Sequence, residues 1–304
     1  MKIVYLILIA AILTTCSPKR TTEGPFDLVA YHLEIESWHQ KRLENLKGPK
    51  GWLNLAGLFW LKDGINTFGS GENNDIVFPE GKIPARAGFF MLKNNIVTLE
   101  VAPHVVIKSK GQPVKTLVAY HPDSARGAVQ EYESLQWFTI KRDDKFGIRL
   151  RDFKNPELEN FKGIERYPVD AAWRVEARFG KSDSLKTINI TNILGQTTPQ
   201  PSPGTIIFTI NEKEYRLDAL ADDEGSSEYF MIFGDATNTK ETYGAGRYLY
   251  INKPDADGKT IIDFNKAYNP PCAFTAFATC PLPPRQNILD IEVTAGEKNY
   301  GSYH

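Results

Sequence analysis

The sequence has few of the residues on which many catalytic and metal sites depend. Its 304 residues include only 3 cysteines and 5 histidines. It contains no Gly-x-Ser-x-Gly elbow, no His-Glu-x-x-His motif and no phosphate-binding loop. Gly69-Ser70-Gly71 and Gly244-Ala245-Gly246 each lack the further glycine of a dinucleotide fingerprint. The chain therefore carries no signature of a serine hydrolase, zinc protease or nucleotide enzyme, and we expect neither a cofactor nor a bound metal.

Concentrated positive charge is also absent. The chain has 36 lysines and arginines against 37 aspartates and glutamates, and no basic run stands out. Nucleic-acid binding needs a basic patch or stripe, so nucleic acid is not an expected partner. With 41% hydrophobic and 24% charged residues, the composition is that of an ordinary globular protein. We find no internal repeat and no low-complexity tract.

Long apolar runs are missing except at the N-terminus. There Lys2 precedes an apolar run from Ile3 to Leu13, which has the length of a signal-peptide core and is too short to span a bilayer comfortably. The run ends at Leu13-Thr14-Thr15-Cys16, which resembles a bacterial lipobox, in which the cysteine becomes the acylated N-terminus. We predict a signal peptide over 1–15, lipidation at Cys16 and a polar tether over 16–25. An ordinary secretory signal is the alternative.

A lipidated, exported chain would lie in the cell envelope, held on a bacterial membrane at its periplasmic or outer-membrane face. Export places Cys272 and Cys280 in an oxidising compartment, where they remain as a pair once Cys16 carries lipid. A disulfide is the favoured interpretation, and its short loop would stabilise the fold by roughly 2–3 kcal/mol. A zinc site would need further ligands, and no histidine flanks the pair. Buried free thiols are the remaining alternative.

The first segment after the tether has the periodicity of a helix, which we place over 26–48. Its apolar stripe has three-and-four spacing. The stripe consists of Leu28, Tyr31, Ile35, Trp38, Arg42 and Leu46. Arg42 interrupts the stripe, and its side chain either extends to solvent or pairs with a carboxylate. The helical periodicity itself covers residues 26–46, and Gly48-Pro49 then ends the helix.

The rest of the chain alternates short strand-like runs with Gly, Asn and Pro turns, which is typical of β-sandwiches. We predict a first β-sandwich over 49–155 and a second β-rich domain over 156–304, with an irregular connection around 152–172. Separate strands are expected at Trp173–Phe179 and Thr187–Ile193, and a last strand at Ile288–Thr294. The predicted fold class is mostly β, with two β-rich parts and a short N-terminal helix. The sequence leaves open whether the two parts share one core.

One stretch of the first part resembles a forkhead-associated domain, a β-sandwich whose loops bind phosphothreonine peptides. The stretch is Gly64–Phe78 followed by Lys93–Val101. In that family an arginine follows the glycine and a Ser-x-x-His motif comes later. Here Ser70 takes the place of the arginine and no histidine follows, which leaves Arg86 as the nearby phosphate donor. The resemblance implies a degenerate forkhead-associated-like sandwich without phosphopeptide binding.

A second resemblance covers most of the chain after the tether. Motifs in the same order are similar to those of the DUF1684 family of uncharacterised bacterial proteins. The motifs are Gly51–Leu58, Arg149–Asp152, Phe161–Ile164, Ser202–Gly204, Phe233–Thr237, Glu241–Leu249, Asp263–Cys272 and Ala295–Lys298. This resemblance implies a shared fold and no established activity.

The richest set of polar residues lies in the second part. An acid, a phenol and a guanidinium surround the glycines of Glu241–Arg247, and Asp263 and Asn265 alternate so that both can point to one side of a strand. The ligand-binding candidates are Asp235, Glu241, Tyr243, Arg247, Asp263, Asn265 and Asn269. Two arrangements fit. Either Arg247 and the asparagines hold the carboxylate or phosphate of a small ligand, or Arg247 pairs with Asp263 or Glu241 in a buried network.

Two functions follow from these candidates. The favoured one is a lipid-anchored envelope protein that binds a small anionic ligand or another envelope protein. The alternative is a hydrolase-like enzyme, because Asp235, Glu241, Asp263 and Glu297 could supply an acid–base pair or a calcium site. No catalytic residue can be assigned. If the protein is an enzyme, we expect these groups to converge in a pocket where at least one of them has a strongly perturbed pKa. If it is a binding module, we expect an exposed patch or groove without an acid of perturbed pKa.

Overall fold

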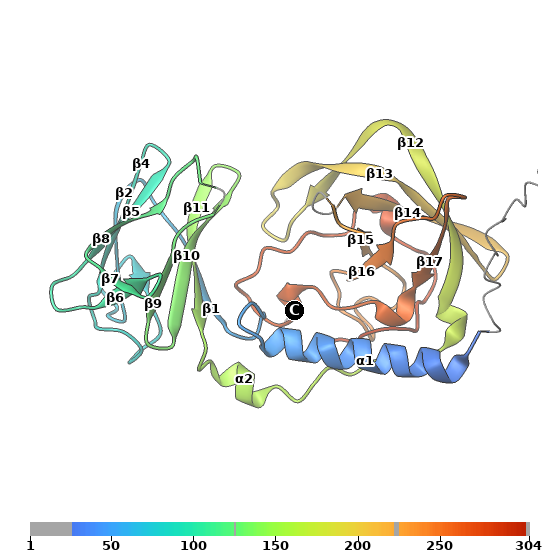
Figure 1. The fold of residues 1–304 in the computed structure, drawn as a ribbon, viewed down its shortest axis with the longest axis horizontal. Helices are drawn as coiled ribbons and strands as arrows, with labels where there is room; N and C mark the ends of the chain where they lie inside the picture. Colours follow the sequence, from blue (N-terminus) through green and yellow to red (C-terminus); the bar gives the residue numbers. More distant parts are fainter. Residues whose placement is uncertain (1–25, 125, 222–224, 302–304) are drawn as a thin grey trace, which may run out of the picture.

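The computed structural model describes residues 26–124, 126–221 and 225–301 (Figure 1). The predicted signal peptide, the lipidation site Cys16 and the tether lie outside these residues. The described chain is mostly β, with an N-terminal helix and several sheets, which confirms the predicted fold class. In the described ranges, no helix combines the length and the apolar character needed to cross a membrane.

The N-terminal helix α1 spans Leu28–Lys47. Its start is fixed by Asp27, whose carboxylate accepts the N–H groups of Val29 and Ala30, so the helix begins two residues later than the predicted start at residue 26. The stripe is buried at Tyr31, Ile35 and Leu46. Although α1 precedes the first β part in sequence, it lies along the second β part (Figure 1).

The first β part is a sandwich of two sheets with one apolar core between them. The six-stranded sheet has the order β1-β11-β10-β9-β6-β7, and the five-stranded sheet has the order β3-β2-β4-β5-β8. The strands are β1 (Leu55–Trp60), β2 (Gly64–Gly69), β3 (Ile76–Val77), β4 (Gly88–Lys93), β5 (Ile96–Val101), β6 (Ile107–Ser109), β7 (Gln112–Val114), β8 (Thr116–Tyr120), β9 (Val129–Tyr132), β10 (Leu135–Arg142) and β11 (Lys145–Asp152). The Trp137 ring packs at its centre against Phe68 and Phe78. The forkhead-associated resemblance stays a prediction.

The second β part is a six-stranded antiparallel sheet of order β16-β15-β14-β13-β12-β17. Its strands are β12 (Arg174–Thr191), β13 (Thr197–Ile210), β14 (Lys213–Ala221), β15 (Glu228–Phe233), β16 (Arg247–Asn252) and β17 (Lys259–Asp263). The prediction of separate strands at Trp173–Phe179 and Thr187–Ile193 was wrong. A register shift between Lys181 and Lys186 lets one long strand continue through the polar stretch between them.

This second sheet curls until its end strands meet. The Thr260 hydroxyl on β17 donates 2.8 Å to the carbonyl of Asn252 at the end of β16. The two strands are not joined in a hydrogen-bonded ladder, so the sheet has an open seam between them. The Tyr31 hydroxyl of α1 reaches Asp263 at the end of β17 at 2.9 Å. The helix therefore lies against this seam.

The two β parts are joined by a small apolar cluster. Leu46 of α1, Leu53, Phe161, Ala273 and Phe274 pack together in it. The predicted irregular connection contains one short helix, α2, over Pro156–Asn160. The domain limit predicted between 155 and 156 falls between the end of β11 and the start of α2, and it stays a prediction. The described residues also form the 3-10 turns η1 (Ala171–Trp173), η2 (Phe264–Lys266), η3 (Pro271–Ala273) and η4 (Arg285–Asn287).

Candidate functional site

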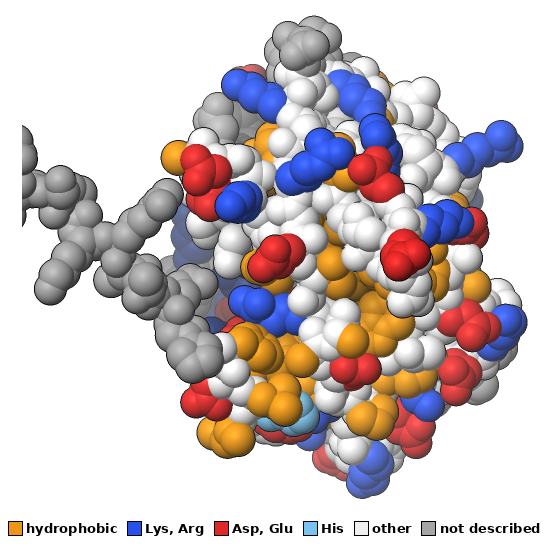
Figure 2. Space-filling model, turned by 90° about the vertical axis from the view of Figure 1, so that its right-hand side faces the viewer, with side chains coloured by type: hydrophobic (Ala, Val, Ile, Leu, Met, Phe, Trp, Pro, Cys, Tyr) orange, Lys and Arg blue, Asp and Glu red, His pale blue; other side chains and the backbone are white. Residues whose placement is uncertain are grey.

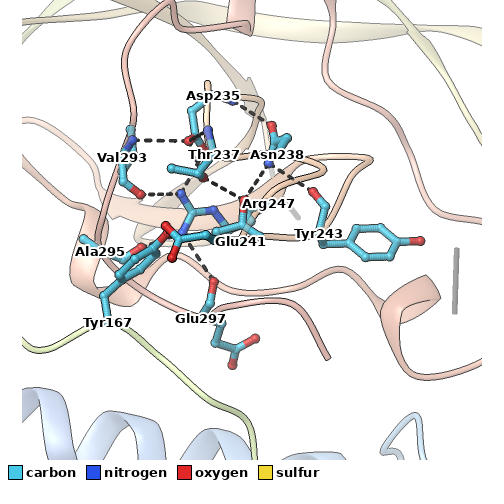
Figure 3. Close-up of polar contacts among 11 residues, drawn as sticks. Tyr167, Asp235, Thr237, Asn238, Glu241, Tyr243, Arg247, Val293, Ala295 and Glu297 are labelled. Carbon is cyan, nitrogen blue, oxygen red and sulfur yellow. Dashed lines mark hydrogen bonds and ion pairs between the residues drawn. The ribbon is translucent and has the colours of Figure 1, made fainter. Parts of the chain in front are cut away.

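Arg247 lies at the centre of an enclosed polar network (Figure 3). It begins β16, and both its side chain and that of Asp235, just after β15, are 0% exposed. The Arg247 Nη2 atom is 2.8 Å from the Asp235 Oδ2 atom. The other carboxylate oxygen of Asp235 accepts bonds from the Thr237 N–H, the Thr237 hydroxyl and the Val293 N–H. The predicted partners of Arg247, Asp263 and Glu241, were therefore wrong, because Asp235 faces it across the β15–β16 connection.

The remaining hydrogen bonds of Arg247 explain why the predicted strand at Ile288–Thr294 does not form. The guanidinium donates to the carbonyls of Val293 at 2.9 Å and Ala295 at 2.5 Å. These carbonyls would otherwise need a neighbouring strand. One arginine thus takes the place of a strand ladder and holds the irregular C-terminal segment against the sheet. Both terminal nitrogens of Arg247 are thus bonded to protein groups, and although its Nε atom has no acceptor among the described residues, the side chain is 0% exposed and leaves no room for a ligand.

Asn269 belongs to a second enclosed network, which connects α1 to the same C-terminal segment. Its N–H donates to Glu297 Oε2 at 2.7 Å, and its carbonyl accepts from Arg42 Nη2 at 2.9 Å. Arg42 also pairs with Glu297 at 3.2 Å and lies over the Tyr268 ring at 4.7 Å. Of the two alternatives for Arg42, pairing with a carboxylate is confirmed. Asn269 is 0% exposed, so we interpret it as part of the scaffold and not as a ligand-binding residue.

Glu297 gives this network a measurable pH dependence. Burial raises the pKa of its carboxyl above the ordinary 4.5, and the nearby Arg42 guanidinium offsets this only in part. The folded protein therefore keeps the proton to higher pH than the unfolded chain does. We expect the free energy of unfolding of the wild type, relative to Glu297→Gln, to fall as the pH rises from 4.5 through the raised pKa.

Urea titrations of both proteins at a series of pH values would measure this difference. Because glutamine does not ionise, subtracting its curve removes the contributions of all other acids. A difference that stays constant, or that increases with pH, would contradict the enclosed carboxyl described for Glu297.

Glu241 and Tyr243 do not converge with Arg247. The Glu241 carboxylate is exposed and accepts the Tyr167 hydroxyl at 2.7 Å. This hydrogen bond lowers the pKa of Glu241 from its ordinary value. The Tyr243 ring points away from both Arg247 and Glu241 (Figure 3) and packs beside the linked cysteines. The structure joins Cys272 and Cys280 in a disulfide, beside Tyr243.

Asp263 and Asn265 form a third group, at the open seam. Asp263 Oδ1 accepts the Tyr31 hydroxyl and the Asn265 N–H. Asn265 is buried, and its amide donates to the Tyr31 oxygen and to the Asp170 carbonyl, both at 2.8 Å. Burial, followed by the nearby Asp263 charge, raises the pKa of Tyr31 well above its ordinary value. Asn265 thus fixes the end of β17 against α1, while Asp263 remains at a surface.

That surface is a cleft of about 220 Å³ between α1 and the seam of the second sheet. Its walls come from α1, β12, β15, β16, β17 and the turn after β17. The lining residues are Glu34, Trp38, Arg174, Glu228, Tyr250, Ile251, Asn252, Ile261, Asp263, Lys266 and Tyr268. Three aromatic side chains lie together in it. Tyr268 stacks with Tyr250 at 6.3 Å between centroids and lies 6.5 Å from Trp38. We call this feature the α1 cleft.

The α1 cleft also carries charges of both signs. Lys266 pairs with Glu34 at 2.5 Å. Arg174 stands across from Asp263 in the β12–β17 register, and its guanidinium lies over the rings of Phe26 and Tyr31 at 5.2 and 6.0 Å. Among the described residues no carboxylate lies within ion-pair distance of Arg174. The cleft therefore combines aromatic walls with a cation that is not engaged by an acid.

Of the seven residues predicted from the sequence, only Asp263 lines this cleft. Asp235, Arg247, Asn269 and Asn265 are buried in structural networks. Arg174 was not predicted from the sequence, because its role depends on the pairing of β12 with β17. Tyr268 lies inside the Asp263–Cys272 motif and Trp38 inside the helical stripe, but neither was among the predicted ligand-binding residues. Over the described ranges, no three His, Cys, Asp or Glu side chains come close enough to hold a metal ion.

Comparisons with known proteins support the family resemblance over the second β part, and the Gly51–Leu58 and Arg149–Asp152 motifs lie outside the matched residues. A family model described as "Protein of unknown function (DUF1684)" matches residues 159–298. Among solved structures, the chain is similar to an uncharacterized protein of Haloarcula marismortui determined by solution NMR, at 32% identity. The similarity covers 47% of this chain and 80% of that chain, with a TM-score of 0.39. No curated protein matches. Through residues 159–298, this chain belongs to the DUF1684 family of proteins of unknown function.

Proposed function

We propose that this protein is a lipid-anchored protein of the bacterial cell envelope that binds a small anionic ligand in the α1 cleft. The observation that carries the proposal is the chemistry of that cleft. Arg174 supplies a guanidinium without a carboxylate partner among the described residues, beside the stacked rings of Tyr250 and Tyr268. Such binding sites typically combine apolar and aromatic walls with a few placed polar groups.

The geometry indicates the class of ligand. A volume of about 220 Å³ accommodates one ring or a similar small group. Aromatic faces stack on the flat, apolar faces of such rings, and a guanidinium binds carboxylate or phosphate oxygens in a bidentate manner. Glu34, Glu228 and Asp263 at the rim can accept hydroxyl hydrogens. A sugar acid or a sugar phosphate would use all three features.

Membrane attachment is supported by the surface near the start of α1. On the outward face of the helix Val29 is 72% and Leu33 is 65% exposed, and Phe26 beside them is 53% exposed. Figure 2 shows hydrophobic side chains gathered on this end of the molecule. Cys16 stands 10 positions before Phe26, so a lipid on it would lie within about 35 Å of these side chains. Interfacial insertion of exposed apolar residues would add to the lipid anchor.

The hydrolase alternative has no comparable support. Its central residues lie in separate places: Arg247 is enclosed, Glu241 is at the surface beside Tyr167, and Asp263 lies in the α1 cleft. A general acid and base must both reach the same substrate atoms. We therefore favour binding over catalysis for this set of residues.

A panel of monosaccharides, uronic acids, sugar phosphates and amino acids would test the proposal. We expect one of the anionic compounds to raise the melting temperature, and Arg174→Met to weaken its binding at least tenfold by calorimetry. Losing a charge-assisted bidentate contact accounts for an effect of that size. Trp38→Leu should weaken binding as well, since it removes one aromatic wall.

Arg178→Met is the matched control. Arg178 lies on the same strand as Arg174, is exposed and lies outside the α1 cleft. It should leave the affinity unchanged. If only neutral compounds bind, or if the two arginine variants bind equally well, the assignment of an anion to Arg174 fails.

A further inference from the structure

Arg149 lies in an unusual position on the first β part. It is the first residue of the Arg149–Asp152 motif at the end of β11. Ile148 and Leu150 point into the sandwich core. Because side chains alternate along a strand, Arg149 and Arg151 project from the opposite face of the sheet. Even so, Arg149 is only 7% exposed.

The guanidinium of Arg149 has no partner among the residues that the structure describes. In the described parts of the chain it makes no hydrogen bond or ion pair, and its Nε atom is fully enclosed without an acceptor. The neighbouring Arg151 differs, because it donates to the Gly51 carbonyl and to the Asn54 side chain. A buried charge normally has a counter-charge or a full set of hydrogen bonds, since leaving water is costly.

The surroundings of Arg149 add positive charge. Burial, followed by repulsion from Arg142 and Arg151, lowers the pKa of its guanidinium to about 10. Within the described ranges no carboxylate pairs with these three arginines: Arg142 donates to the Lys141 carbonyl, and the partners of Arg151 are uncharged. The cross-strand neighbours of Arg149 are Leu58 and Phe138, which are apolar. This face therefore combines uncompensated positive charge with poor hydration.

We infer that Arg149 is the anchor of a binding site for a small oxyanion, of the phosphate class, on the outer face of strands β1, β11 and β10. Only the Nε atom is sealed, so the terminal amino groups at the partly exposed tip remain accessible to an anion. These groups form a planar fork that matches two oxygens of such an anion. A doubly charged anion would compensate both Arg149 and its neighbour Arg151. The site has no lining residue in common with the α1 cleft, so it stands independently of the proposed function.

Inorganic phosphate is the probe that tests the inference. Its affinity would be measured by calorimetry at constant ionic strength, adjusted with sodium chloride, for the wild type and for Arg149→Met. We expect the methionine variant to bind phosphate at least tenfold more weakly, and Arg149→Lys to fall between the two. Without phosphate, Arg149→Met should melt at a temperature no lower than the wild type, because it removes an unpaired buried charge. Arg285→Met, at an exposed arginine, is the control and should bind phosphate as the wild type does.

Equal phosphate affinity in the wild type and Arg149→Met would overturn the inference. If the methionine variant does not fold, wild-type crystals soaked in tungstate give the answer, since tungstate is a heavy analogue of phosphate. Anomalous density within hydrogen-bond distance of the Arg149 guanidinium would support the site. Density only at other arginines, or no density, would overturn it.

Discussion

Replacing Asp235 by alanine should lower the free energy of unfolding by about 3–5 kcal/mol, the range found when one partner of a buried ion pair is removed. The loss is large because the Arg247 side chain is 0% exposed and would become a buried charge without a counter-charge. The N–H groups of Thr237 and Val293 would lose their acceptor at the same time. The C-terminal segment that Arg247 holds should then loosen.

Urea unfolding followed by circular dichroism would measure this loss, and hydrogen exchange of the amides in residues 288–297 would locate it. Glu241→Gln is the matched control. Its carboxylate is exposed and holds only a surface contact with Tyr167 and Lys298, so Glu241→Gln should lower the free energy of unfolding far less than Asp235→Ala does. If Asp235→Ala were as mild as the control, Arg247 and Asp235 would have to be solvated, and the enclosed network would be wrong.

Cys16→Ser should abolish the incorporation of fatty acid into the protein completely. The lipobox-like Leu13-Thr14-Thr15-Cys16 predicts acylation at this thiol, and serine offers no sulfur for a thioether. Growth with an alkyne-labelled fatty acid, followed by coupling to a fluorophore, would measure the label on the purified protein. Membrane fractionation alone would not suffice, because an uncleaved apolar run from Ile3 to Leu13 could still hold the variant on a membrane.

Cys272→Ser is the control for this experiment, since it removes a cysteine that the structure places in a disulfide. It should keep the full label. Loss of label in both variants, or label retained in Cys16→Ser, would contradict lipidation at Cys16. An exported protein with an ordinary secretory signal would carry no label at all.

The sequence predicted the features that depend on local patterns. The stripe of Tyr31, Ile35 and Leu46 predicted α1, because helical periodicity directly reflects which face is buried. The turn-rich alternation of the later chain predicted two β-rich parts. The last predicted strand failed at Ile288–Thr294, where an apolar segment finds its hydrogen-bond partner in a side chain, Arg247, instead of in a neighbouring strand.

The candidate site could be predicted only in part, because it depends on contacts between distant segments. Asp263 was identified from its position at a strand end. Arg174 becomes important only when β12 pairs with β17 and α1 covers the seam. The burial of Arg149 could not be predicted either. The alternation of side chains along β11 predicts that Arg149 faces solvent, whereas the structure buries it almost fully. No local sequence pattern distinguishes Arg174 and Arg149 from ordinary exposed arginines on a strand.

The most direct test of the central claim is a crystal structure of residues 26–304 soaked with small anionic compounds, among them sugar phosphates and uronic acids. The claim is that the α1 cleft binds the ligand while the Arg247 network serves only as scaffold. We predict density for the anionic group within hydrogen-bond distance of Arg174, with its ring against Tyr250 or Tyr268. A ligand that displaces Asp235 from Arg247, or a cleft that stays empty while a compound binds elsewhere, would contradict the claim.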